Sequence, residues 1–194
     1  MPRDVNLDQR LADIAAATIS VARTSGAHAV TLRSVATQLG GSTTLVTNYL
    51  PTRAALILNA LDQGRDRWRA ELDDVLATVP ASQRLAAVVE WALTSTTDDP
   101  VLRALILEIV ANAGVEPDMA ASLRRESDIF RTMLEEAAAE SGFADPARVA
   151  DVTYLMVRGA YIANTEDPAH WDETHVRDVI RATIALQHDA HRTT

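Results

Sequence analysis

The chain has 194 residues, enough for one or two domains with a substantial core. It contains no cysteine, which excludes disulfides, thiolate metal sites and a cysteine nucleophile. The net charge is −9, and we find neither a signal-peptide pattern nor an apolar run long enough to span a bilayer. We therefore expect a cytoplasmic protein.

The charge is unevenly distributed along the chain. Residues 1–60 contain five arginines and three aspartates, a net charge of +2, whereas the remainder carries −11. This asymmetry is typical of a weakly basic, DNA-contacting head on an acidic body.

The first elements predicted are a helix over about residues 7–24, ended by Gly26, and a short helix after it. Thr31 is a candidate N-cap for the short helix. Its apolar residues recur with the period of a helix and predict one buried stripe: Leu32, Val35, Ala36 and Leu39. The pair Gly40–Gly41 then permits the turn that stops this helix.

A second short helix follows, with Ser42 as its candidate cap and Pro51 near its end. One half of this helix is polar, and it carries Thr43, Thr44, Thr47 and Asn48. On the other half, Val46 and Leu50 can pack inward. A short helix whose apolar side packs against the protein and whose polar side faces outward suits the major groove of DNA. The two helices therefore predict a helix-turn-helix.

The rest of the chain also shows helical patterns separated by turn residues. We expect helices over about residues 53–78, 82–95, 101–113, 117–140, 145–164 and 172–188, with Ser82 as a possible cap and 101–113 largely buried. The predicted fold is all-α: an N-terminal three-helix helix-turn-helix domain, residues 1–52, plus a C-terminal helical bundle, residues 53–194. This gives about nine helices in total.

Several motifs in the first 60 residues are similar to a known family. They are Thr31-x-x-x-Val35-Ala36, Gly40-Gly41-Ser42, and Leu50-Pro51-Thr52-Arg53 followed by Leu56. Together they resemble the DNA-binding domain of TetR-family (tetracycline-repressor-like) transcriptional regulators. That family usually has an aromatic residue where Thr47 stands, Phe at Leu50 and Lys at Arg53. The resemblance implies that residues 53–194 form a ligand-binding and dimerisation domain.

We assign the DNA-contacting role to nine residues of the head. They are Thr31, Arg33, Ser42, Thr43, Thr44, Thr47, Asn48, Tyr49 and Arg53. Asn48 is suited to adenine and Arg33 to guanine or phosphate, while Arg53 is expected to hold a phosphate. Thr31 is interpreted as a cap, a phosphate contact or both, and Tyr49 as either core or a phosphate contact.

The body is expected to form the dimer and to bind a small molecule. The last two helices, 145–164 and 172–188, are the dimer candidates, and Gly159, Ala160 and Ala163 would allow close approach. Polar residues inside apolar helices and a set of large side chains are the candidate ligand site: Trp68, Trp91, Arg103, Glu108, Asn112, Phe130, Met133, Tyr154, Arg158 and Tyr161. Each buried charge is either an internal ion pair or a ligand contact, and the aromatic residues are alternatively ordinary core.

The favoured function is a ligand-responsive regulator, most simply a repressor, that binds a palindromic operator as a homodimer and is released by an unknown effector. No cofactor, metal or catalytic residue is expected. An enzyme is disfavoured because Asp73–Asp74 and Asp98–Asp99 lack the third acid of an isoprenoid synthase, and His175, His188 and His191 more simply face solvent. A helical adaptor without DNA binding remains the other alternative.

Overall fold

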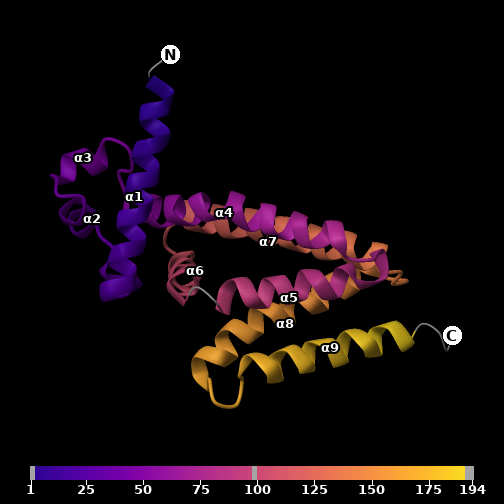
Figure 1. Cartoon of the computed structure of the whole chain (residues 1–194). Coiled ribbons are helices and arrows are strands. Elements are labelled where there is room, and N and C mark those ends of the chain that lie inside the picture. The colour runs from indigo at the N-terminus through magenta and orange to yellow at the C-terminus, as the bar shows by residue number, and fades with distance from the viewer. Residues whose placement is uncertain (1–2, 98–99, 191–194) are drawn as a thin grey trace. The chain divides into compact units, whose positions relative to one another are not determined.

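The computed structural model describes residues 3–97 and 100–190. The all-α prediction is confirmed: the described part of the chain contains nine α-helices and no strand (Figure 1). Their bounds are α1 (Arg3–Ser25), α2 (Leu32–Gln38), α3 (Thr43–Thr47), α4 (Arg53–Thr78), α5 (Arg84–Thr97), α6 (Pro100–Asn112), α7 (Pro117–Glu140), α8 (Pro146–Glu166) and α9 (Glu173–Ala190). Two short 3-10 turns, η1 (Ala27–Ala29) and η2 (Ala81–Gln83), precede α2 and α5.

The chain forms two compact units, and each draws on two stretches of sequence. Unit 1 comprises residues 1–69 and 99–125, and unit 2 comprises residues 70–98 and 126–194. Helices α4 and α7 therefore each contribute their first part to unit 1 and their last part to unit 2. The functional division at residue 52 stays a prediction, because these units are defined by packing alone.

The core of unit 1 joins the helix-turn-helix to α4 and α6. Val35 and Val46 are fully buried, and so are Leu56 and Leu105 from the two longer helices. Leu32, Leu39 and Leu50 pack against this core from its edge. The predicted stripe of α2 and the inward packing of Val46 are therefore confirmed. Burial of these apolar side chains fixes the backs of α2 and α3, so their polar faces are left outside.

Local backbone chemistry sets the ends of these helices. Gly26 has φ 87° and donates its N–H to the Ala22 carbonyl, ending α1 as predicted. A side chain at Gly26 would also place its Cβ only 2.8 Å from the His28 ring. Thr31 is confirmed as the N-cap of α2: its hydroxyl accepts the Ser34 N–H, and the Ser34 hydroxyl accepts the Thr31 N–H, a capping box.

Unit 2 is built from α5, α8 and α9 with the last parts of α4 and α7. Leu72, Val88 and Leu134 are at most 1% exposed, and Val157 and Ile180 complete the core from α8 and α9. Glu90 on α5 pairs with Arg177 (2.7 Å) and Arg181 (3.0 Å) on α9. Burial lowers the pKa of Arg177, but Glu173 and Glu90 outweigh it and leave that pKa raised.

Three local predictions were wrong. Ser82 does not cap α5, because it lies within η2 and the helix begins at Arg84. Helix α6 is not buried all round: Leu105 and Ile109 are buried, but Val110 is 48% exposed. Ser42 occupies the N-cap position of α3, yet its side chain makes no capping hydrogen bond.

Candidate functional site

The polar face of α3 lies at the surface of unit 1. Thr43, Thr44 and Asn48 are exposed and Thr47 is partly exposed, while Val46 on the opposite side is fully buried. Tyr49 is 38% exposed, so it is a surface residue, and the interpretation as core was wrong. The short hydroxyl and amide side chains are therefore exposed on one side of the helix, while burial of the other side holds the helix in place. Reading of base edges requires both features.

The start of α2 adds further groups to the surface of unit 1. Thr31 and Arg33 are exposed, as is Ser42 before α3. The Thr31 hydroxyl is occupied by the capping box, whereas the Ser42 hydroxyl makes no capping bond. Ser42 is therefore open to an external acceptor or donor. The sequence predicts Thr31 as the cap, but not the capping box that Ser34 completes with it.

Arg53 points into unit 1. Its Nε donates to the Val30 carbonyl at 2.9 Å, and its Nη2 donates to the Ala27 carbonyl at 3.1 Å. The same Nη2 lies 2.6 Å from Oε1 of Glu108 on α6, and this oxygen also accepts a 3.0 Å bond from the Asn112 amide. Of the two alternatives for Glu108, the internal ion pair is therefore confirmed. Arg53 holds together the turn before α2, the start of α4 and the middle of α6.

The ten candidate ligand residues divide between the units. Trp68, Arg103, Glu108 and Asn112 lie in unit 1, and the other six lie in unit 2. In unit 1, Trp68 packs against the core, and Glu108 is bonded both to Arg53 and to the amide of Asn112. These residues are therefore accounted for largely by internal contacts.

The six residues of unit 2 come together around its core. Trp91, Phe130, Met133, Tyr154 and Tyr161 are all partly buried against it. The rings of Phe130 and Tyr154 lie 5.9 Å apart, and the Arg158 guanidinium lies over the Tyr154 ring, 5.2 Å from its centre. These six residues thus bring aromatic side chains together with one cationic side chain, that of Arg158.

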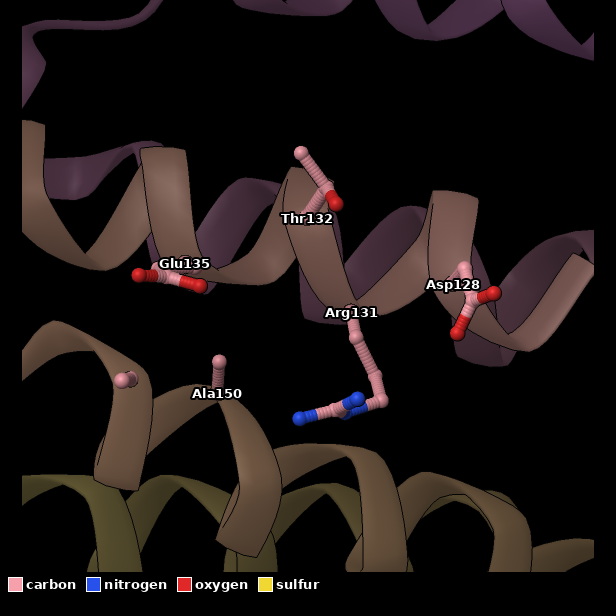
Figure 2. A pocket seen from close by; sticks show the side chains of 6 residues that line it. Asp128, Arg131, Thr132, Glu135 and Ala150 are labelled. Atoms are coloured by element: carbon pink, nitrogen blue, oxygen red, sulfur yellow. The ribbon is translucent and has the colours of Figure 1, made fainter. Parts of the chain in front are cut away.

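A polar groove on α7 and α8 was missed by sequence reasoning. It has a volume of about 240 Å³ and is lined by Asp128, Arg131, Thr132, Glu135, Ala147 and Ala150. Figure 2 shows Arg131 extending from α7 toward α8, with Asp128 and Glu135 to either side along the helix. Arg131 donates twice to Asp151 (2.9 and 2.7 Å), and this hydrogen bonding raises its pKa. The alternation of charge at positions 128, 131 and 135, one face of a helix, was the available signal.

Two of the candidates for other functions fall partly beyond the described residues. Asp98–Asp99 and His191 lie outside them, as does the side chain of His188. Among the residues that the structure does describe, no group of three or more His, Asp or Glu side chains is placed to hold a metal ion. Within the same residues, no helix is both long and apolar enough to cross a membrane.

Residues 80–189, more than half of the chain, match the family model of the BetI-type transcriptional repressor C-terminal domain. This chain is a member of the TetR family of transcriptional regulators. The match covers the second half of the sequence, and the motifs of the head lie in the first. The two parts of this TetR-family regulator therefore point to one family independently.

Solved structures agree with the family in fold. A TetR transcription regulator from Haloarcula marismortui is 22% identical with a TM-score of 0.78, over 94% of this chain and 98% of that one. A transcriptional regulator from Rhodococcus is 21% identical with a TM-score of 0.75, over 91% and 94% of the two chains. A putative transcriptional regulator from Saccharomonospora viridis, solved in complex with choline, is 18% identical with a TM-score of 0.72, over 92% and 96%. The search of curated proteins gave no match.

Proposed function

We propose that this TetR-family regulator binds a palindromic operator as a homodimer and is released from it by a small organic effector. The observation that carries the proposal is the exposed polar face of α3 with Val46 buried behind it. A single such helix reads few base pairs, so two copies reading half-sites roughly 34–36 Å apart are required for specificity. Repression is the simplest outcome, because a bound dimer excludes other proteins from the same DNA.

Within unit 1 we assign distinct roles to the exposed residues. Asn48 reads an adenine edge, and Thr43, Thr44 and Thr47 contact thymine methyl groups or base edges. Arg33 binds guanine or a phosphate, and Ser42 and Tyr49 bind phosphates. A phosphate contact of Thr31 would have to replace one of its bonds to Ser34, because its hydroxyl and its N–H both donate to that residue. Arg53 fixes the turn before α2 from inside, since its Nε and Nη2 are both engaged by protein atoms.

The homodimer is proposed to form through α8 and α9. Leu155 (69% exposed) and Ile162 lie on one face of α8, with exposed Gly159 between them. Val179 and Leu186 (70% exposed) lie on one face of α9. Apolar side chains at i and i+7 form a stripe along a helix, and two such stripes on adjacent helices favour a helical interface between two copies.

The effector is proposed to bind unit 2 and to act by differential affinity. It binds best to a conformation in which the two heads do not fit the operator, and so lowers DNA affinity. Helix α4 is continuous from Arg53 to Thr78 and supplies residues to both units, so it is the proposed mechanical link. Regulation, and no catalysis, is the proposed activity.

DNA binding is tested with fluorescence anisotropy on duplex from the region flanking the gene, against a scrambled duplex of equal length. We expect specific binding that Asn48→Ala weakens by about ten- to a hundredfold, the cost of a lost bidentate base contact. Gln63→Ala removes an exposed amide from α4 of the same unit and should change nothing. Equal affinity for both duplexes would contradict the proposal and favour the adaptor.

Dimerisation is tested by sedimentation equilibrium of a variant that combines Leu155→Glu with Leu186→Glu. Carboxylates in an apolar interface require desolvation without a partner, so we expect monomer and loss of operator binding. Val115→Glu is the control, because Val115 is 78% exposed and does not belong to α8 or α9. An unchanged dimer in the double variant would place the interface elsewhere.

Effector release is tested by adding small molecules to the operator complex. Choline, bound in the structure from Saccharomonospora viridis, is one probe, and organic acids are another. Release of DNA by a probe that also binds free protein supports the sensor, whereas failure of every tight-binding probe to change operator affinity contradicts it.

A further inference from the structure

Helix α8 carries a stripe of three side chains, Tyr154, Arg158 and Tyr161, at i, i+4 and i+7. The Tyr154 hydroxyl accepts a 2.9 Å hydrogen bond from Ser127 on α7. The Tyr161 hydroxyl donates to the Ala92 carbonyl on α5 at 3.4 Å. The two ends of the stripe are thus tied to two different helices, and Arg158 lies between them in the sequence of α8, within unit 2.

Arg158 is half-buried and lacks an anionic partner among the described residues. Its guanidinium carbon lies 5.2 Å from the centre of the Tyr154 ring, a cation–π distance. Its Nε–H is buried and has no hydrogen-bond acceptor. The Nε–H of Arg84 likewise has no acceptor, but Arg84 has a carboxylate partner in Glu140, as Arg131 has in Asp151 and Arg177 in Glu90. The missing anion is therefore what distinguishes Arg158. Removing a guanidinium from water costs free energy when one of its N–H groups has no acceptor. Binding of an anion to that N–H would offset the cost.

We propose that the effector is a small organic monocarboxylic acid and that Arg158 binds its carboxylate. The planar fork of a guanidinium matches a carboxylate, and its Nε–H is the vacant donor. The acid's apolar part would contact the aromatic side chains of the stripe and Phe130, whose ring lies 5.9 Å from that of Tyr154. The proposal deepens the proposed function and rests on it, because it names the ligand class of unit 2.

The charges around Arg158 disfavour the other ligand classes. A quaternary ammonium ligand needs an open aromatic face, and the face of Tyr154 already holds the Arg158 cation. A phosphate monoester carries about −1.5 to −2 charges at neutral pH, more than one guanidinium neutralises. A carboxylate matches the single positive charge.

Isothermal titration calorimetry of the full chain with matched pairs tests the ligand class. The probes are benzoate against benzamide, hexanoate against hexanamide, phenyl phosphate and choline. We expect at least one carboxylate to bind, and its amide to bind at least tenfold more weakly because it has no charge. Choline or an amide binding more tightly than every acid would overturn the proposal, as would absence of acid binding at millimolar concentration.

Arg158→Gln tests the residue. We expect at least a tenfold loss of acid affinity with an unchanged melting temperature, and partial retention in Arg158→Lys, which keeps the charge without the fork. Arg148→Gln, an exposed arginine on the same helix, is the matched control and should bind the acid as the wild type does. Wild-type affinity in Arg158→Gln would overturn the assignment.

The same variants separate this inference from its rivals. Arg158→Gln should remain a dimer in sedimentation equilibrium, and a monomeric variant would mean that the missing anion is a carboxylate of a second copy, which overturns the ligand proposal. If choline releases operator DNA and acids do not bind, the sensor stands and this inference fails. If the wild type binds no operator, the proposed function fails, and calorimetry still decides whether Arg158 binds an acid.

Discussion

Arg53 in unit 1 and Arg158 in unit 2 are both half-buried arginines, but their surroundings differ. Arg53 donates to the carbonyls of Ala27 and Val30 and pairs with Glu108 at 2.6 Å. Arg158 lies against the Tyr154 ring, and its buried Nε–H has no acceptor. The first network is closed by the protein itself, and the second is open to a ligand.

This difference matches the tasks proposed for the two units. A surface that reads base edges needs side chains held within a fraction of an ångström, so its supporting bonds should be complete without a ligand. A sensor must gain free energy when its ligand arrives, so a polar group left incomplete in the free protein is useful. The contrast between the two arginines therefore has consequences for stability, DNA affinity and effector binding that can be measured separately.

The largest effect is expected from Arg53→Ala. The substitution removes the side-chain donor of two carbonyls and leaves the Glu108 carboxylate with the Asn112 amide but no cationic partner, so it should lower the free energy of unfolding by about 2–3 kcal/mol. Arg158→Ala removes only the ring contact and should cost less than about 1 kcal/mol. Urea denaturation of both variants measures the difference. Equal losses would mean that the two environments do not differ energetically.

The second effect concerns DNA affinity and its dependence on salt. Arg33→Ala should weaken operator binding about tenfold and, if it neutralises a phosphate, make the slope of log K against log salt shallower by about one. Arg53→Ala should weaken binding with an unchanged slope, because its guanidinium supports the head from inside. Arg69→Ala, an exposed arginine on α4, is the control. A shallower slope for Arg53→Ala would restore it as a phosphate contact.

Much of the fold could be predicted from the sequence because helix ends are local. Turn residues and apolar spacing predict the helices Arg53–Thr78 and Pro117–Glu140 directly. The capping role of Thr31 follows from its position just before a run of apolar residues with helical spacing. The first residues of α5 could not, since a 3-10 turn over Ala81–Gln83 competes with capping by Ser82. Apolar spacing and turn residues in the sequence do not distinguish such a 3-10 turn from the first turn of an α-helix.

The site was less predictable because it depends on contacts between distant residues. The spacing around Glu108 showed a charge in an apolar helix, but not that its partner would be Arg53, 55 positions earlier. The split of the ten candidate ligand residues between two units is likewise a property of tertiary packing. Tyr154 and Arg158 were named as separate candidates, and only the structure gives their ring-to-guanidinium contact.

A third prediction compares two serines near helix starts: Ser34 lies in the first turn of α2, and Ser42 lies just before α3. Ser34→Ala breaks the capping box of α2 and should cost about 1 kcal/mol of stability. Ser42→Ala should leave stability unchanged, because the Ser42 hydroxyl makes no capping bond, but should weaken operator binding. Thermal unfolding and anisotropy on the same samples separate the two effects. Destabilisation by Ser42→Ala would show that this hydroxyl does cap α3 in solution.

The smallest effect is expected from Tyr154→Phe in unit 2. The variant loses the hydrogen bond from Ser127 and should cost about 0.5–1 kcal/mol, while the ring that faces Arg158 is retained. Tyr49→Phe is the matched control, because Tyr49 is an exposed tyrosine whose hydroxyl we assign to DNA, so its stability should not change. Acid binding by Tyr154→Phe should fall only slightly, since the carboxylate is assigned to Arg158. A large loss of binding at unchanged stability would instead mean that the Tyr154 hydroxyl itself contacts the effector, and the site would then extend from α8 toward Ser127 on α7.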